Sequence, residues 1–163
     1  MADRLTIAFH LNGIQTTREV FARVHLADFL RQEMGLTGTH LGCEHGACGA
    51  CSVRLDGAVV RGCLILAVQV DGRSVDTIEG LSDAGELVSL QGAFHRRNAL
   101  QCGFCTPGML LTAAELIERE RSPDRRQIRE YLSGNLCRCT GYHAIVDAVD
   151  EVCRDRDAGG AVC

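Results

Sequence analysis

Ten cysteines in a chain of 163 residues constrain this sequence more than any other feature. Eight of them fall into two groups of four, one group in each half of the chain. The first residues lack the unbroken apolar run of a secretion signal, so the thiols are expected to remain in a reducing compartment. At such a density, reduced cysteines usually bind metal and do not form disulfides. The cysteine pattern therefore predicts two metal centres.

The first group is compact, and its spacing is C-x4-C-x2-C-x11-C: Cys43, Cys48, Cys51 and Cys63. Plant-type ferredoxins use this arrangement for a [2Fe–2S] cluster, in which each of the two irons needs two thiolates. Glycines between Gly42 and Gly49 let the loop turn tightly and bring backbone N–H groups close to the sulfurs. Structural zinc prefers two separate knuckles. The spacing therefore favours iron–sulfur over zinc, and His45 is interpreted as a loop residue, not a ligand.

The second group is divided into two distant pairs with the spacing C-x2-C-x31-C-x-C: Cys102, Cys105, Cys137 and Cys139. On its own, this pattern favours a metal site over redox thiols and does not choose between iron and zinc. A predicted helix begins at Thr106-Pro107, so its N-terminal amides would face an anionic centre. Of the remaining cysteines, Cys153 is interpreted as a buried apolar filler and Cys163 as an incidental free thiol.

The first half of the chain has the alternation of β-strands. Apolar and polar residues alternate over 5–11, Asn12-Gly13 is a typical hairpin turn, and a second extended stretch follows from Ile14 to Val20. A helical face with Leu26, Phe29, Leu30 and Met34 follows, with Gly35 as its stop. Short strands are predicted at Ser52–Leu55, Ala58–Arg61 and Ser74–Ile78. This half is predicted to be a small α+β domain spanning residues 1–80.

The second half has helical periodicity. Four short helices are predicted, the first ending near Asn98, the second capped by Thr106, and the third capped by Ser122 and ending at Gly134. The fourth carries Ile145, Val149 and Val152 on one face. Short connections favour a compact four-helix bundle over residues 81–154, followed by a flexible tail at 155–163.

Charge and hydropathy exclude several functions. The net charge of −4 and the pI near 5.8 argue against a nucleic-acid binder. The longest apolar run, residues 63–68, is far too short to span a membrane. The protein is therefore expected to be soluble and cytoplasmic.

Three motifs are distinctive: GCEHGACGAC at 42–51, QCGFCTPG at 101–108 and GNLCRCTGY at 134–142. They resemble those of the small iron–sulfur subunit of the xanthine oxidase family, which includes aerobic carbon monoxide dehydrogenase, nicotine and quinoline hydroxylases and 4-hydroxybenzoyl-CoA reductase. The resemblance extends over about residues 4–153, and all eight expected ligands are present. It implies that the second group also binds a [2Fe–2S] cluster. It also implies a ferredoxin-like β-grasp domain followed by a four-helix bundle.

The resemblance further implies a route for electrons. They would pass singly from a molybdopterin centre on a large subunit, expected as the cytosine dinucleotide, to the second group. The first group would follow, and then FAD on a medium subunit. Gln101 and Cys139 match family positions that approach the pterin, and no catalytic residue is expected on this chain. The FAD and molybdenum domains are expected on separate chains, in a dimer of heterotrimers.

Several alternatives stay open at this point. A stand-alone ferredoxin-like carrier or redox sensor would explain the first group but leave the helical half without a role. A zinc-stabilised interaction module is a third hypothesis. Within the family, a two-chain variant could deliver electrons to a cytochrome in place of a flavin. Because substrate specificity belongs to the large subunit, CO, an aldehyde, an aromatic thioester and an N-heterocycle are all compatible, with a preference for the N-heterocycle.

Overall fold

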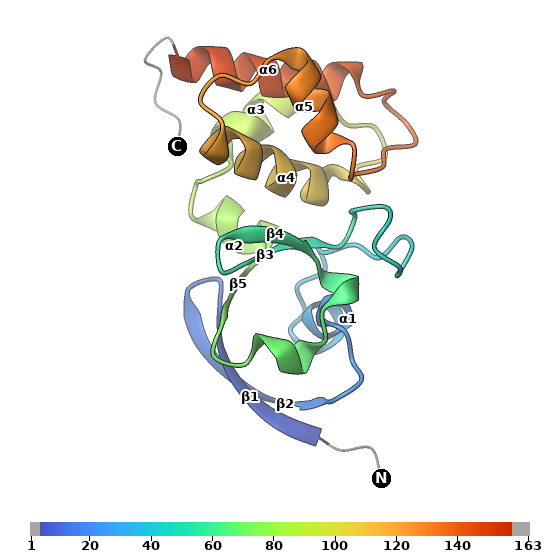
Figure 1. The fold of residues 1–163 in the computed structure, drawn as a ribbon, viewed down its shortest axis with the longest axis vertical. Helices are drawn as coiled ribbons and strands as arrows, with labels where there is room; N and C mark the ends of the chain where they lie inside the picture. Colours follow the sequence, from blue (N-terminus) through green and yellow to red (C-terminus); the bar gives the residue numbers. More distant parts are fainter. Residues whose placement is uncertain (1–3, 158–163) are drawn as a thin grey trace.

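The computed structural model describes residues 4–157, and these form a sheet-containing half and a helical half (Figure 1). The sheet begins with a hairpin of β1 (Arg4–Leu11) and β2 (Ile14–Phe21). Asn12 and Gly13 both have positive φ, at 51° and 78°, because a two-residue turn of this hand matches the twist of the strands. The predicted hairpin is confirmed.

The sheet is mixed and has the strand order β2-β1-β5-β3-β4. The inner strand β5 (Ser74–Asp76) runs parallel to β1 and antiparallel to β3 (Ser52–Leu55), and β4 (Ala58–Arg61) is at the edge. The predicted end of β5 at Ile78 is wrong, because the Asn12 side chain accepts the Thr77 N–H at 2.8 Å and α2 (Ile78–Asp83) begins there. A tertiary contact with the hairpin turn thus ends the strand.

One helical segment packs on this sheet. It consists of α1 (Leu26–Asp28) continued by a π-helical stretch, Phe29–Glu33, and it stops before Gly35, whose φ is +71°. Its fully buried Phe29 ring lies 5.9 Å from that of Phe9 on β1. The helix was predicted from its apolar face, whereas the π-helical winding was not. Two single 3₁₀ turns, at Gly62–Leu64 and Ala67–Val70, complete this half.

The helical half consists of α2 and four longer helices: α3 (Val88–Arg96), α4 (Thr106–Arg119), α5 (Arg125–Leu132) and α6 (His143–Asp157). In Figure 1, α4 lies between the sheet and the other long helices, and it contacts β3, β4, α3 and α5. The α+β class is confirmed, and α2 adds a fifth helix to the four predicted. The regular four-helix bundle and the domain limits stay predictions.

Two predicted helix caps are wrong. Thr106 lies inside α4, and its buried hydroxyl has no hydrogen-bond partner, while Cys105 occupies the cap position. Helix α5 is capped by Asp124, not Ser122, because the Asp124 carboxylate accepts the N–H groups of Arg126 and Gln127, both at 2.8 Å. Ser122 instead donates a hydrogen bond to Asp157 at 2.7 Å.

The ends of the last helices also differ slightly from expectation. Helix α5 ends at Leu132, two residues before the predicted stop at Gly134, and α6 extends through Asp157 into the predicted tail. Cys153 is buried in the helical core, as predicted, and Cys163 lies outside the described residues. Within residues 4–157, no helix has both the length and the hydropathy needed to cross a membrane.

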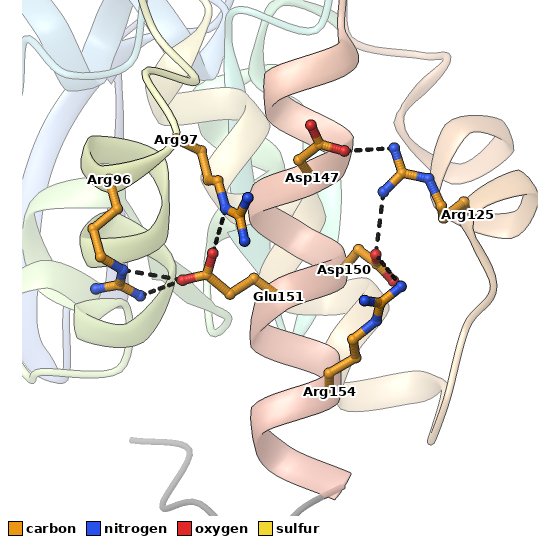
Figure 2. A network of polar contacts seen from close by, with 7 residues as sticks. All are labelled: Arg96, Arg97, Arg125, Asp147, Asp150, Glu151 and Arg154. Carbon is orange, nitrogen blue, oxygen red and sulfur yellow. Dashed lines mark hydrogen bonds and ion pairs between the residues drawn. The ribbon is translucent and has the colours of Figure 1, made fainter.

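Ion pairs tie α6 to its neighbours (Figure 2). They involve seven residues: Arg96 and Arg97 at the end of α3, Arg125 of α5, and Asp147, Asp150, Glu151 and Arg154 of α6. Arg125 bridges Asp147 and Asp150 at 2.5 and 3.1 Å, and Glu151 binds both α3 arginines. Because acids of α6 face arginines on two sides, the network fixes α6 between α3 and α5.

Candidate metal centres

The first cysteine site is built mainly by the loop that precedes β3. Glu44, Gly46 and Gly49 have φ values of 57°, 83° and 74°, so the loop that carries Cys43 and Cys48 reverses direction repeatedly. Cys51 follows directly before β3, and Cys63 lies in the 3₁₀ turn after β4. The thiols interact in pairs, Cys43 with Cys48 and Cys51 with Cys63.

The two pairs of this site have different electrostatics. Backbone N–H groups of His45 and Cys48 lower the pKa of Cys43 to about 6, and the Cys48 N–H lies 3.4 Å from its sulfur. Burial raises the pKa of Cys51 to about 11, and this side chain is only 2% exposed. A buried thiolate needs a compensating positive charge, which a bound metal supplies. The Cys51 side of the site is therefore suited to metal and not to free thiolates.

The second cysteine site is assembled from two loops. Cys102 and Cys105 lie before α4, whereas Cys137 and Cys139 lie between α5 and α6. The packing of α4 against α5 brings these loops together. The sulfurs of Cys102 and Cys139 are 3.5 Å apart, and Cys105 and Cys137 are close enough to shift one another's pKa. The site therefore also consists of two pairs, each with one thiol from either loop.

At the second site, burial and neighbouring groups shift the pKa values of Cys105 and Cys137. Burial raises the pKa of Cys105 to about 12. Burial also raises the pKa of Cys137, but the Thr140 hydroxyl and N–H, at 3.1 and 3.5 Å from its sulfur, outweigh this effect and lower the pKa overall. The Tyr142 hydroxyl accepts the Cys137 N–H at 2.8 Å and so holds the loop in place. Neither Thr140 nor Tyr142 was predicted to act here, because both contacts depend on the loop's folded shape.

The arrangement of the thiols fits the chemistry of a [2Fe–2S] cluster. Each of the two irons in such a cluster binds two thiolates, and each site presents two pairs of thiols. Across residues 4–157, no three or more His, Cys, Asp or Glu side chains are grouped around one point in the manner of a single-ion site. None of the nine described cysteines forms a disulfide. The donor sets are therefore compatible with one cluster at each site.

The two sites differ in exposure. Cys51 and Cys63 are buried, whereas Cys102 and Cys139 are exposed, as is Gln101 beside them. His45 is exposed in the first loop, with its Nδ1 2.6 Å from the carbonyl oxygen of Cys43. The second site thus reaches the protein surface, and the two residues predicted to approach a pterin lie on that surface.

Comparison with protein families confirms the chemistry of both halves. Residues 9–77 match the family described as a 2Fe-2S iron-sulfur cluster binding domain, and residues 77–150 match the [2Fe-2S] binding domain family. The second match favours iron at the second site, where the cysteine spacing alone left the metal open.

Individual relatives are similar over nearly the whole chain. The chain is 57% identical to the nicotine 6-hydroxylase small subunit of Paenarthrobacter nicotinovorans, over 91% of this chain and 89% of that protein. It is 51% identical to the caffeine dehydrogenase subunit gamma of a Pseudomonas species, over 90% and 89%. Among solved structures, quinoline 2-oxidoreductase from Pseudomonas putida 86 superimposes with a TM-score of 0.89 at 48% identity, covering 97% of this chain and 99% of that one.

Two adjoining [2Fe–2S]-binding units define this molecule as an electron-transfer protein. With identities near one half over about nine tenths of the chain, it belongs to the xanthine oxidase family, as the iron–sulfur subunit of a molybdenum hydroxylase or dehydrogenase.

Proposed function

We propose that this subunit conducts single electrons from a molybdopterin centre on a large partner to FAD on a medium partner. Its eight grouped cysteines would hold the clusters: Cys43, Cys48, Cys51 and Cys63 at the first site, and Cys102, Cys105, Cys137 and Cys139 at the second. When bound, a [2Fe–2S] cluster accepts and releases one electron. The pairing of the thiols two by two at both sites is the observation that carries this proposal.

Contact with partner chains is supported by exposed apolar side chains at the sites. Around the second site, Leu100, Phe104 and Leu136 are 42%, 46% and 54% exposed. Beside the first site, Leu64 and Leu66 are 60% and 39% exposed. Exposed apolar side chains next to polar ones are typical of contact surfaces. The order of transfer, with entry at the second site and exit at the first, follows the family resemblance.

Gln101 and Cys139 are proposed as the contacts to the pterin. Both are exposed at the second site, so a group on another chain can reach them. The Cys139 thiol also contacts the Cys102 thiol, and hence one side chain would touch both the pterin and the cluster. An electron would then cross from the partner to this chain over a short distance.

The proposed complex consists of this subunit, a molybdopterin-binding subunit with the cytosine dinucleotide and an FAD-binding subunit, assembled as a dimer of heterotrimers in the cytoplasm. The proposed substrate is an N-heterocycle. This choice is supported by the relatives, which are named for nicotine, caffeine and quinoline. Relatives named as aldehyde oxidoreductases are less similar, at 46% and 40% identity.

The proposal is tested by purifying the chain with its natural partners. We expect about four irons per chain, two distinct EPR signals on reduction, and molybdenum and FAD in the larger chains. Adding nicotine, caffeine or quinoline in turn, without an electron acceptor, should reduce the clusters if an N-heterocycle is the substrate. A lone monomer that exchanges electrons with soluble reductases would instead support a free carrier. A colourless zinc protein would overturn both readings.

A further inference from the structure

Asn135 lies at the centre of a buried contact between the two cysteine sites. Its side chain is 1% exposed and makes hydrogen bonds with three groups. Its Nδ2 donates to the Gly49 carbonyl at 3.3 Å, and its Oδ1 accepts from the Thr112 hydroxyl at 3.1 Å and from Arg61 at 3.1 Å. We call Gly49, Arg61, Thr112 and Asn135 the inter-site contact.

The position of Asn135 in the chain makes this contact relevant to both sites. Gly49 lies between Cys48 and Cys51, whereas Asn135 lies two residues before Cys137. A single amide therefore binds the first cysteine loop from the second. Because Thr112 belongs to α4 and Arg61 to β4, the same amide is also fixed to both halves of the molecule. A side-chain amide offers both the donor and the acceptor that these partners require.

The backbone segments around Asn135 are closely packed. The Leu136 N–H donates to the Cys48 carbonyl at 2.8 Å, directly beside Asn135. A Cβ on Gly108 would lie 2.3 Å from the Gly49 oxygen, and one on Gly49 would lie 2.7 Å from the Gly134 oxygen. The two cysteine loops thus touch through backbone atoms, and small displacements of either loop change the distance between the sites.

We propose that Asn135 is a positioning residue that fixes the separation of the two clusters and thereby the rate of electron transfer between them. This inference rests on the proposed function. In the step concerned, one electron leaves the reduced second cluster and reduces the oxidised first cluster, with no bond formed or broken. Since electron tunnelling weakens steeply with distance, a loop held in place sustains the rate.

The test compares two matched substitutions in the complete complex. Asn135→Asp keeps the size of the side chain and the acceptor for Arg61 and Thr112, but it replaces the donor to Gly49 with a repelling oxygen. Asn12→Asp is the control, because Asn12 also donates through Nδ2, to the Thr77 hydroxyl at 3.2 Å, at the hairpin turn. Both proteins are reduced with dithionite. The splitting of the EPR signals by magnetic coupling between the clusters, which falls with the cube of their separation, is then compared.

We expect Asn135→Asp to lose part of the splitting with four irons still bound per chain, and Asn12→Asp to keep all of it. Four irons with an unchanged splitting in Asn135→Asp would overturn the inference. If Asn135→Asp loses iron, the double variant Thr112→Val with Arg61→Gln is measured, because it frees the Asn135 amide to turn. An unchanged splitting there would overturn the inference as well. Failure of the proposed function shows separately, in an unaltered complex that lacks four irons or two signals.

Discussion

The two cysteine sites reach the same paired arrangement by different means. In the first, three cysteines lie within nine residues, and positive φ angles at Glu44, Gly46 and Gly49 shape the loop around them. In the second, two pairs with 31 residues between them in the chain meet because α4 packs on α5. The first site is thus mostly a product of local conformation, and the second is a product of helix packing.

The groups that lower the thiol pKa values also differ between the sites. Backbone N–H groups lower the pKa of Cys43, whereas the hydroxyl and the N–H of Thr140 lower that of Cys137 against burial. The first site keeps two of its cysteines buried, and the second exposes two. The first site, made mainly by one loop, is thus partly enclosed, whereas the second site, made between helices, is open to a partner.

The largest expected effect is the loss of one cluster, and its cost in stability should differ between a buried ligand and an exposed one. Cys51→Ser and Cys102→Ser should each lose about half of the iron and one EPR signal, because each removes one of four ligands. Cys51→Ser should also lower the free energy of unfolding by about 1–3 kcal/mol more, since it leaves a buried hydroxyl without its metal. Iron analysis, EPR and urea unfolding measure these losses. Equal stabilities of the two variants would contradict the difference in burial.

Two glycine substitutions compare a tight contact with an open turn. Gly108→Ala should cost about 3 kcal/mol, because the new Cβ would press on the Gly49 carbonyl and separate α4 from the first loop. Gly103→Ala should cost about 1 kcal/mol, because φ there is +81° but nothing lies within 4 Å. Urea unfolding of both proteins gives the difference. If Gly103→Ala were the less stable of the two proteins, the contact between Gly108 and the Gly49 carbonyl would not be tight.

Removal of the observed helix cap should weaken the second site selectively. Asp124→Ala should cost about 1 kcal/mol, because two N–H groups at the start of α5 lose their acceptor. Since α5 leads into Cys137, chelators should then remove iron faster from the second site than from the first. Ser122→Ala is the control and should change stability little, because Ser122 is exposed and does not cap the helix. Iron release followed by EPR distinguishes the sites.

The smallest expected effect is on the melting temperature at low pH. The arginines Arg96 and Arg97 lower the pKa of Glu151 below its ordinary value. A carboxyl with a lowered folded-state pKa stabilises the protein above its unfolded pKa, near 4.3, and that stabilisation is lost as the pH falls through the folded value. Glu151→Gln should therefore flatten the fall in melting temperature below about pH 4. The control is Asp76→Asn in the sheet, where burial raises the pKa, so the sign reverses. If both variants changed the pH dependence of the melting temperature in the same direction, the predicted difference in sign would be contradicted.

Features with short-range causes could be predicted from the sequence. The hairpin follows from alternation and Asn12-Gly13, and three of the four cysteines of the first site follow from a spacing that one loop can satisfy. The existence of α4 follows from its Thr106-Pro107 start and its helical period. In each case the residues that cause the structure lie close together in the chain, so their pattern is visible there.

Only the tertiary structure decided the rest. The strand β5 ends because Asn12, 65 residues away, accepts the Thr77 N–H. Helix α5 is capped by Asp124, whose carboxylate completes a capping box that the Ser122-Pro123 pair obscured. The sequence placed Asn135 in a motif but could not predict its role, because its partners Gly49, Arg61 and Thr112 come from three distant segments. Sequence by itself determined which residues could bind the clusters, and long-range packing decided how the two sites are held together.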